Sequence, residues 1–336
     1  MSSVFTDNEW SPLKCVLVGR ANNSCFPSAP ARMTEATLPE RHWPNFRANN
    51  PFPKEILQEA EVELDQFSAI LQREGIEVHR ADVVDWLSHG GYTGAMPRDG
   101  LLVVGNHVIE SIFSWPCRRN EVDLAYGGIL SQLEQDTSVK VIKAPKPTGR
   151  ETLLDDNPLG PWAINNSRAV FDAADFMRLG RTILGQLSHV TNMKGFEYVQ
   201  ATVPEGYVVE LVDVDDEHAM HIDATILPLR PGLLVYNPQR VTEVSLRKHQ
   251  VLKDWELCPL PFVPMPREYP PSFMVSPWIT LNVLVLDGRK VVVEESDEDF
   301  AEWLRELGME PIPCPFKHVH SIGGSFHCAT VDLKRD

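Results

Sequence analysis

The feature that most constrains the fold is a short module that recurs along the chain. In each copy one or two polar residues lead into a pair of hydrophobic strands, at residues 96–111, 221–238 and 278–296. Segments 168–186 and 324–336 resemble diverged or truncated copies. The pair Asp287-Gly288 separates two β-rich runs, which is a strong hairpin signal. A repeat of this size predicts an α/β radial array in place of one wound sheet, with the polar residues at the strand starts meeting at its centre.

The first third of the chain has a β, α, β pattern. The run from Cys15 to Val18 predicts a strand that ends at Gly19. Residues 53–75 place apolar side chains at helical spacing, begin with a proline and end at Gly75, so they predict an amphipathic helix. A second strand is expected directly after this helix. Further helix-like segments between the modules are expected at 121–135 and 298–308.

The charge balance narrows the class of partner. The 336 residues include 31 Lys+Arg and 47 Asp+Glu, which gives a net charge of -16. Such a chain repels nucleic-acid phosphates and anionic membrane surfaces, so we expect no nucleic acid and no membrane partner, and a small molecule instead. The length allows one large domain or two ordinary ones. We interpret residues 1–336 as a single catalytic domain.

The cysteines and the N-terminus bear on the compartment. The six cysteines are scattered, with no CxxC pair and no regular spacing of a disulfide or zinc framework, which favours a reducing compartment. The first residues lack a basic start followed by an apolar run, and no apolar run approaches membrane-spanning length. We therefore expect a cytoplasmic protein.

Polar residues taken from each module form a candidate catalytic set. They are Asp99, Asp172, His221 with Asp223, Ser276 just before the fourth module, and Cys328. His221 and Asp223 are two residues apart on a predicted strand, so both side chains leave the same face. A fully buried strand would not ordinarily carry both inward, because unpaired buried polar groups are costly. A solvent-facing pair on a half-exposed strand fits this spacing equally well.

Cys328 stands out among the six cysteines. Gly323 and Gly324 precede it and allow a tight turn before the strand predicted to carry the thiol. A lone cysteine is more often a small buried apolar residue, so the glycine turn and the convergence of the modules carry the functional interpretation. A nucleophilic thiol needs a base, and His221 is the candidate. His327 is adjacent in sequence, but neighbouring strand residues point to opposite faces.

The carboxylates of the second module have two interpretations. Asp172 and Asp175 are three residues apart, a spacing that a helical turn would bring together, although this is a weak signal for an acid/base or metal pair. The more economical role for Asp172 is to orient His221.

Metal and cofactor sites are not predicted. His218, His221 and Asp223 lack the helical HExxH spacing and have no thiolate set beside them. His318 and His320 are interpreted as loop or strand-surface residues.

At this point several short motifs in one order carry a resemblance. MPRD, FDAADF, MHIDA, YNPQR and GGSFHC resemble the arginine:glycine and arginine:inosamine-phosphate amidinotransferases, and the similarity runs over nearly the whole chain. The resemblance implies the five-bladed αβ-propeller of guanidino-modifying enzymes, with pseudo-fivefold repeats. It also implies a catalytic centre of Cys328, His221 and Asp172.

The resemblance further implies a donor site. Asp99 and Asp223 match the carboxylates that hold the guanidinium, which suits the directed hydrogen bonds of that planar group. Arg240 matches the arginine that holds the α-carboxylate of the donor, helped by Ser276. Two departures affect specificity: Val275 stands where glycine-using members have a second serine, and the stretch SWPCRR (114–119) differs from the usual pattern.

The implied function is transfer of the amidino group of L-arginine to an acceptor amine through a covalent amidino-cysteine, with release of ornithine. The alternatives are a deiminase-like or dimethylargininase-like guanidine hydrolase and a catalytically inactive arginine-binding protein. The acceptor stays open among lysine, glycine, an amino-sugar phosphate and a specialised-metabolite amine. The resemblance also implies a homodimer. The lack of a targeting segment and the altered SWPCRR and MVSPW stretches favour a bacterial biosynthetic enzyme.

Overall fold

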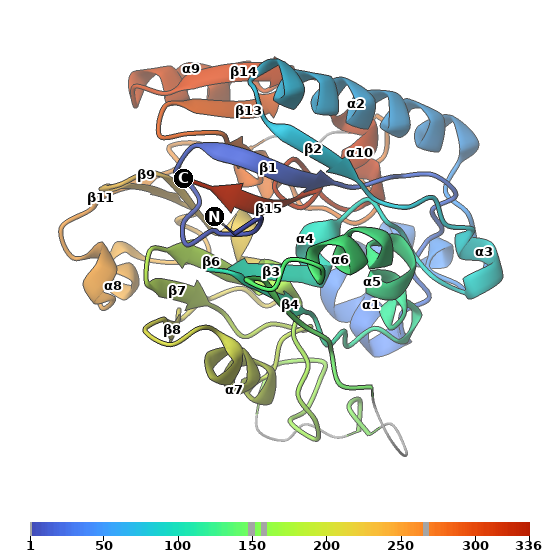
Figure 1. The fold of residues 1–336 in the computed structure, drawn as a ribbon. Coiled ribbons are helices and arrows are strands. Elements are labelled where there is room, and N and C mark those ends of the chain that lie inside the picture. The colour runs from blue at the N-terminus through green and yellow to red at the C-terminus, as the bar shows by residue number, and fades with distance from the viewer. Residues whose placement is uncertain (1, 147–151, 156–159, 265–268) are drawn as a thin grey trace.

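The computed structural model describes residues 2–146, 152–155, 160–264 and 269–336, and these residues form five three-stranded sheets. Figure 1 shows how the sheets are arranged and that the two ends of the chain lie close together, beside β1 and β15. Five small sheets with helices between them agree with the predicted pseudo-fivefold array.

Four of the sheets share one plan, in which an antiparallel hairpin is followed by a third strand that runs parallel to the second. Their strands are β3 Leu101–Val104, β4 His107–Glu110 and β5 Lys140–Ile142; β6 Phe176–Leu179, β7 Thr182–Gly185 and β8 Val208–Leu211; β9 Ile226–Arg230, β10 Leu233–Tyr236 and β11 Glu256–Pro259; and β12 Leu284–Val285, β13 Lys290–Glu294 and β14 Glu310–Cys314. The predicted modules are these hairpins, including the Asp287-Gly288 turn between β12 and β13.

Glycines explain why three of the hairpins turn where they do. Gly105, Gly180 and Gly232 lie between paired strands and have φ values of 55°, 72° and 85°. Only glycine adopts this left-handed backbone without a steric penalty, so one glycine sets the position of the turn in each of these three hairpins.

The fifth sheet is built from both ends of the chain. The strand β15 (Thr330–Arg335) pairs antiparallel with β1 (Leu13–Val18), and β1 pairs in parallel with β2 (Glu77–Arg80). The C-terminal segment, which the sequence suggests is a truncated copy, is therefore completed by the N-terminal strands. This pairing covers the edge strand that each end would otherwise expose.

Helices fill the connections between strands. The α-helices are α1 Ala31–Thr37, α2 Lys54–Arg73, α3 Trp86–His89, α4 Pro97–Gly100, α5 Glu121–Ala125, α6 Gly127–Leu133, α7 Met193–Thr202, α8 Glu243–Leu246, α9 Glu298–Glu306 and α10 Lys317–Ile322. The 3-10 turns are η1 Glu40–Asn45, η2 Pro116–Arg118, η3 Ala173–Asp175, η4 Ile222–Ala224, η5 Gln250–Leu252 and η6 Pro277–Leu281. The predicted helix at 53–75 is α2, which begins after Pro53 and ends before Gly75.

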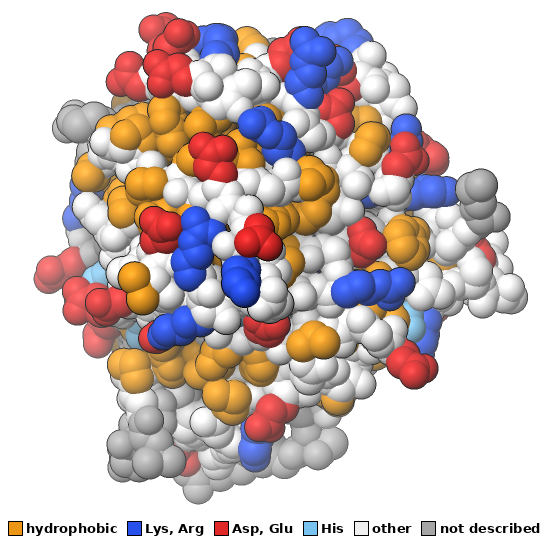
Figure 2. Space-filling model, turned by 90° about the vertical axis from the view of Figure 1, so that its left-hand side faces the viewer, with side chains coloured by type: hydrophobic (Ala, Val, Ile, Leu, Met, Phe, Trp, Pro, Cys, Tyr) orange, Lys and Arg blue, Asp and Glu red, His pale blue; other side chains and the backbone are white. Residues whose placement is uncertain are grey.

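The core lies between the sheets and their helices. Apolar residues of α2 such as Leu64, Phe67 and Leu71 are fully buried, and α2 packs against α10. Figure 2 shows a face on which hydrophobic side chains lie among charged side chains of both signs. Within the described residues, no helix is long and apolar enough to cross a membrane.

Candidate active site

A cleft of about 560 Å³, including its open mouth, gathers residues from several modules. Its walls include His221 and Asp223 of the third module, Asn282 of the fourth and Cys328 of the fifth. Arg240 and Ser276 also line it. Asp99 and Asp172 both contact His221 and are buried. The predicted convergence of polar residues at the strand starts is therefore present.

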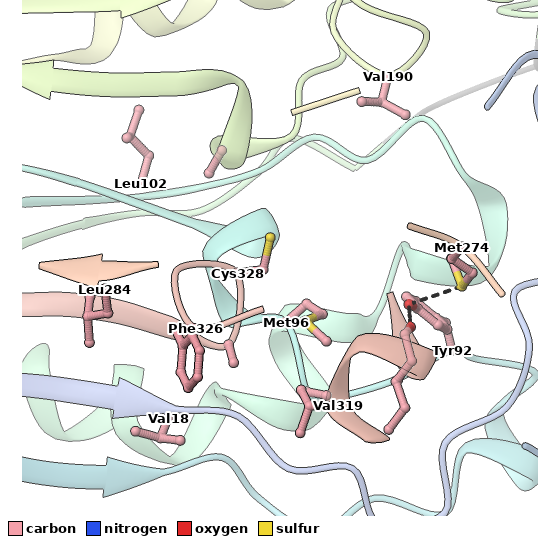
Figure 3. Packing of buried hydrophobic residues seen from close by; sticks show 14 of the residues in the cluster. Val18, Tyr92, Met96, Leu102, Val190, Met274, Leu284, Val319, Phe326 and Cys328 are labelled. Atoms are coloured by element: carbon pink, nitrogen blue, oxygen red, sulfur yellow. Dashed lines mark hydrogen bonds between the residues drawn. The ribbon is translucent and has the colours of Figure 1, made fainter. Parts of the chain in front are cut away.

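Cys328 lies in the turn that precedes β15, where the sequence predicts a strand. Gly323 has a φ of 124°, and a Cβ on Gly324 would lie 2.6 Å from the Cβ of Cys328, so glycine is required beside the thiol. Figure 3 shows the Phe326 ring pointing toward Val18 while the sulfur of Cys328 points the other way. The turn thus anchors Phe326 in the core and places the thiol of Cys328 at the cleft.

His221 also corrects the strand prediction. It has a φ of 67° and precedes the turn η4, so His221 and Asp223 face the cleft from a loop and not from one face of a strand. This left-handed backbone is unfavourable for a histidine, and the main-chain N–H of His221 donates to Asp175 Oδ1 at 2.9 Å. Asp175 therefore holds the strained residue in place.

The imidazole of His221 lies between two buried carboxylates. Its Nε2 is 3.2 Å from Asp172 Oδ2 and its Nδ1 is 3.6 Å from Asp99 Oδ1. Burial lowers the pKa of His221, but the Asp99 charge and the hydrogen bonds that Asp172 and Cys328 make with the ring outweigh it, so that the pKa is raised well above 6.5. These surroundings favour the imidazolium form of His221.

The surroundings of Cys328 favour the neutral form of its thiol. Burial and then the Asp223 charge raise its pKa to about 12, although the contact with His221 opposes the rise. These surroundings favour the protonated thiol when no cationic ligand is bound. A positive ligand beside the sulfur would favour the thiolate.

Arg118 is a central residue that the sequence reasoning missed. It is buried, and its guanidinium lies 3.0 Å from Asp99, 3.4 Å from Asp172 and 2.6 Å from Glu121, over the ring of Phe113 at 4.2 Å. It belongs to SWPCRR, which the sequence marks only as a departure from the family pattern. We call the group around it the Arg118 cluster: Asp99, Arg118, Glu121, Asp172 and His221.

A second buried network is connected to the thiol through His327 and Asp223. Arg178 binds both oxygens of Glu9 at 2.7 Å and Asp332 at 2.6 Å, and Asp332 also contacts Arg98 and Arg335. We call these residues the Arg178 cluster: Glu9, Arg98, Arg178, Asp332 and Arg335. Here the pKa of Glu9 and of Asp332 is lowered, because the attraction of the arginines exceeds the cost of burial.

His327 and Asp223 connect the Arg178 cluster to the thiol. His327 Nδ1 is 2.8 Å from Asp223 Oδ2, its Nε2 is 3.4 Å from Glu9 Oε2, and Asp223 Oδ2 is 3.4 Å from Cys328 Sγ. His327 is not on a strand, so the predicted reason for setting it aside is wrong. It acts on the site through Asp223, whose pKa is lowered because the His327 contact outweighs burial.

The Asp172 and Asp175 pair does not share a helix face. Asp172 precedes the 3-10 turn η3, and Asp175 is bound by Gln186, Ser188 and Thr191. Burial raises the pKa of Asp175 to about 6. Asp172 contacts the imidazole and Asp175 contacts its backbone, so the two carboxylates support His221 from different sides.

Arg240 and Ser276 lie at the wall of the cleft. Arg240 Nε is 2.9 Å from Asp216 Oδ2, and among the described lining residues it is the one arginine or lysine. Ser276 is exposed and Val275 is half-buried beside it. Arg240 therefore places a positive charge at the wall of the cleft.

The remaining histidines differ from their interpretation in part. His320 is buried on α10 and pairs with Ser325, so it is not a surface residue, whereas His318 binds Glu63 and is half-buried. His218 stays exposed at the rim. Asp99, His221 and Cys328 have possible metal-binding atoms within 4.8 Å of one another, but they are the predicted catalytic set and mark no separate site.

Comparison with known proteins decides the family. The chain is 38% identical to an L-arginine:L-lysine amidinotransferase of Pseudomonas savastanoi pv. phaseolicola, over 99% of this chain and 95% of the relative. It is 34% identical to the mitochondrial glycine amidinotransferase of Danio rerio, covering 99% of this chain and 83% of that one. The chain belongs to the amidinotransferase family. No protein-family model matches this amidinotransferase.

Solved structures agree with this assignment. The amidinotransferase resembles SxtG of the saxitoxin pathway from Microseira wollei, with a TM-score of 0.89 and 33% identity over 99% of this chain and 97% of that one. It resembles the inosamine-phosphate amidinotransferase StrB1 of Streptomyces griseus with a TM-score of 0.86 and 30% identity, covering 100% of this chain and 97% of that one. The predicted guanidino-modifying fold is confirmed.

Proposed function

We propose that this amidinotransferase moves the amidino group of L-arginine to the amine of a second small molecule through a covalent bond to Cys328. One observation carries the proposal. Beside the thiol and its imidazolium neighbour, Asp99 Oδ1 and Asp223 Oδ1 are buried with no hydrogen-bond partner among the described residues. A guanidinium presents several N–H donors in one plane, which would satisfy both carboxylates.

The first half-reaction begins when the guanidinium adds positive charge beside the sulfur. This charge lowers the pKa of the Cys328 thiol, which releases its proton to solvent, and the resulting thiolate attacks the guanidinium carbon to form a C–S bond. His221 gives its proton to the departing δ-nitrogen, the C–N bond breaks, and ornithine leaves. Asp172 at 3.2 Å keeps the imidazole oriented for this transfer.

In the second half-reaction His221 acts as the base and the sulfur of Cys328 is the leaving group. The acceptor amine attacks the amidino carbon, its proton passes to neutral His221, and the C–S bond breaks with the sulfur leaving as thiolate. Because the amidino group stays on Cys328 after ornithine has left, the acceptor reacts in a separate step and the kinetics are ping-pong, with His221 the acid in one step and the base in the other.

The rival activity is hydrolysis, in which water replaces the acceptor amine. An arginine dihydrolase domain and a dimethylarginine dimethylaminohydrolase have TM-scores of 0.63 and 0.61 to this chain, but only 14% and 13% identity, so they support the fold alone. An inactive arginine-binding protein is the other alternative. The buried Cys328, His221 and Asp172 argue against it because a binding protein has no need of this acid–thiol arrangement.

For the acceptor we propose an amino acid whose carboxylate uses Arg240 after ornithine has left. Arg240 is the single lysine or arginine among the described cleft-lining residues, so donor and acceptor carboxylates would bind it in turn. The relative that is 38% identical is named for lysine and the one that is 34% identical for glycine. We carry forward the single catalytic domain and the homodimer as parts of this proposal.

The experiment is a product assay with L-arginine and a panel of amines that includes lysine and glycine. Ornithine release that depends on an amine, with a matching guanidino product, is the expected result. Steady citrulline without an amine would identify a hydrolase. Tight arginine binding without any product would identify a binding protein, and Cys328→Ala serves as the blank for uncatalysed turnover.

A further inference from the structure

Asn282 is the polar residue that the fourth module contributes to the cleft. It follows the turn η6, is 1% exposed, and lies in a hydrophobic run that leads into β12. Its side chain makes two contacts with one residue. Asn282 Oδ1 accepts the main-chain N–H of Cys328 at 3.0 Å, and Asn282 Nδ2 is 3.1 Å from Cys328 Sγ.

The direction of the amide follows from the first of these contacts. A main-chain N–H can only donate, so the atom that faces it must be the amide oxygen. The amide nitrogen therefore faces the sulfur. The contact with the main-chain N–H is therefore enough to identify the oxygen and the nitrogen of the Asn282 amide.

We propose that Asn282 is a further catalytic residue, which donates a side-chain N–H to the sulfur of Cys328 when that sulfur is a thiolate. The proposal rests on the covalent function of Cys328 given above. The thiolate is present twice in the cycle, first as the nucleophile that forms the C–S bond and later as the leaving group when that bond breaks. A donor fixed at 3.1 Å stabilises the sulfur at both moments without itself gaining or losing a proton.

The charges around the sulfur explain why a neutral donor is useful. Asp99 and Asp223 face the thiol and oppose its ionisation, and His221 is the cation that favours it. Tyr92 is also near, with a pKa raised well above 10 by burial, so its phenol stays neutral. The carboxylates are needed for the guanidinium, whereas an added lysine would compete with the guanidinium for them. The amide of Asn282 favours the thiolate without neutralising either carboxylate.

A purely structural role is the alternative. Asn282 also accepts the N–H of His327 through its main-chain oxygen at 3.2 Å, so it holds the turn that carries the thiol. Asn282→Asp separates the two roles, because a carboxylate still accepts the Cys328 N–H but presents no donor to the sulfur. Asn282→Ala removes both contacts.

The matched control is Asn237→Asp. Asn237 is 0% exposed, and its Oδ1 accepts the main-chain N–H of Gln239 at 2.9 Å, so it has a comparable environment away from the sulfur. The measurement is the pH profile of iodoacetamide labelling at the Cys328 peptide, without arginine. Peptide-level detection separates Cys328 from the other five cysteines.

We expect the pKa of Cys328 to rise by about one to two in Asn282→Ala, and by more in Asn282→Asp, with no change in the control. The kcat at neutral pH should fall roughly three- to tenfold in Asn282→Ala, since a more basic thiolate is scarcer but intrinsically more nucleophilic. A wild-type profile in Asn282→Asp, or an equal shift in the control, overturns the proposal. Absence of ornithine release from the wild type would instead refute the proposed function, and the labelling result would still stand.

A measurement on the wild type covers the case in which the variants do not fold. In protein with labelled asparagine nitrogen, one side-chain amide resonance should titrate together with the Cys328 thiol and lose that titration in Cys328→Ala. If no asparagine side chain follows the thiol, Asn282 is not a donor to it.

Discussion

The two charged clusters connected to Cys328, one through His221 and one through His327 and Asp223, are built from similar residues but have opposite balances of acidic and basic groups. The Arg118 cluster has three carboxylates against Arg118 and His221, while the Arg178 cluster has two carboxylates against three arginines. Burial raises the pKa of Asp99 and Glu121 in the first. The arginines lower the pKa of Glu9 and Asp332 in the second.

This difference supports the proposal that the guanidinium binds beside the Arg118 cluster. The Arg118 cluster has more negative than positive groups, so a bound guanidinium supplies the missing cation. The Arg178 cluster has its carboxylates fully paired and serves to hold His327 and through it Asp223. A buried cluster that lacks a counter-charge is costly, and that cost is a reason to expect a functional site there and a structural role on the other side.

The largest expected effect on activity comes from replacing the thiol of Cys328. Cys328→Ser should abolish ornithine release, because a hydroxyl is far less acidic than a thiol and neither cluster can ionise it. Arginine binding should persist, since the carboxylates of both clusters are unchanged. Initial rates and calorimetric binding measure the two quantities. A serine variant that kept more than about a hundredth of the wild-type rate would rule out a covalent role for Cys328.

Donor selectivity tests whether the carboxylate of arginine is recognised apart from both clusters. Agmatine lacks that carboxylate, so kcat/KM should be at least roughly a hundredfold lower than with arginine. In Arg240→Ala the preference for arginine should shrink sharply, while the Arg118 cluster still binds the guanidinium. Val275 offers no hydrogen bond beside Ser276, so Arg240 carries more of the discrimination. A preference that survives intact in Arg240→Ala would place carboxylate recognition elsewhere.

His221→Asn removes the cation of the Arg118 cluster that lies nearest the sulfur. Contact with His221 lowers the pKa of the Cys328 thiol, so its loss should raise that pKa and slow iodoacetamide labelling at neutral pH by about tenfold. Circular dichroism confirms that the variant is folded. Identical pH profiles of labelling in both proteins would show that His221 does not stabilise the Cys328 thiolate.

The smallest effects concern stability, where the two clusters should respond to pH in opposite directions. The pKa of Glu121 is raised from 4.5 to about 7, so its native form binds a proton more tightly than the unfolded chain does. Its contribution to stability is present below pH 4.5 and is lost as the pH rises toward 7. The pKa of Glu9 is lowered, so its contribution is present above the unfolded pKa of 4.5 and is lost as the pH falls.

Glu121→Gln should therefore flatten the loss of stability between about pH 4.5 and 7, and Glu9→Gln should flatten the loss on the acid side. Each change should be on the order of 1 kcal/mol in the free energy of unfolding. Urea unfolding from acid pH, below 4.5, up to about pH 7 measures both. The same pH dependence in the two variants would show that the clusters do not differ in their charge balance.

The repeat in the sequence predicted the fold well because each copy carries its own turn chemistry. Hairpins, connecting helices and the polar residues at the strand starts all follow from local pattern. The completion of the fifth sheet by β1 could not be read in this way, since Leu13 pairs with Arg335 at the far end of the chain. A pairing of that separation depends on closure of the whole array.

The sequence predicted which residues form the site better than it predicted their backbone conformation. The left-handed conformation of His221 and the turn at Cys328 escaped prediction because a β-rich run gives no sign of where a loop ends. Arg118 escaped because charged residues are usually exposed, so one in a short loop suggests the surface. Asn282 is a single amide within a hydrophobic run, and its role depends on a contact with the fifth module.

The most direct test of the account is the intact mass of the enzyme after incubation with L-arginine alone, followed by mapping of the modified peptide. We predict that the protein gains the mass of one amidino group at Cys328 with release of one ornithine per site, and that an acceptor amine then removes the added mass. An unmodified Cys328 in enzyme that turns over arginine and acceptor would contradict the covalent mechanism, and with it the assignment of the Arg118 cluster as the side that receives the guanidinium.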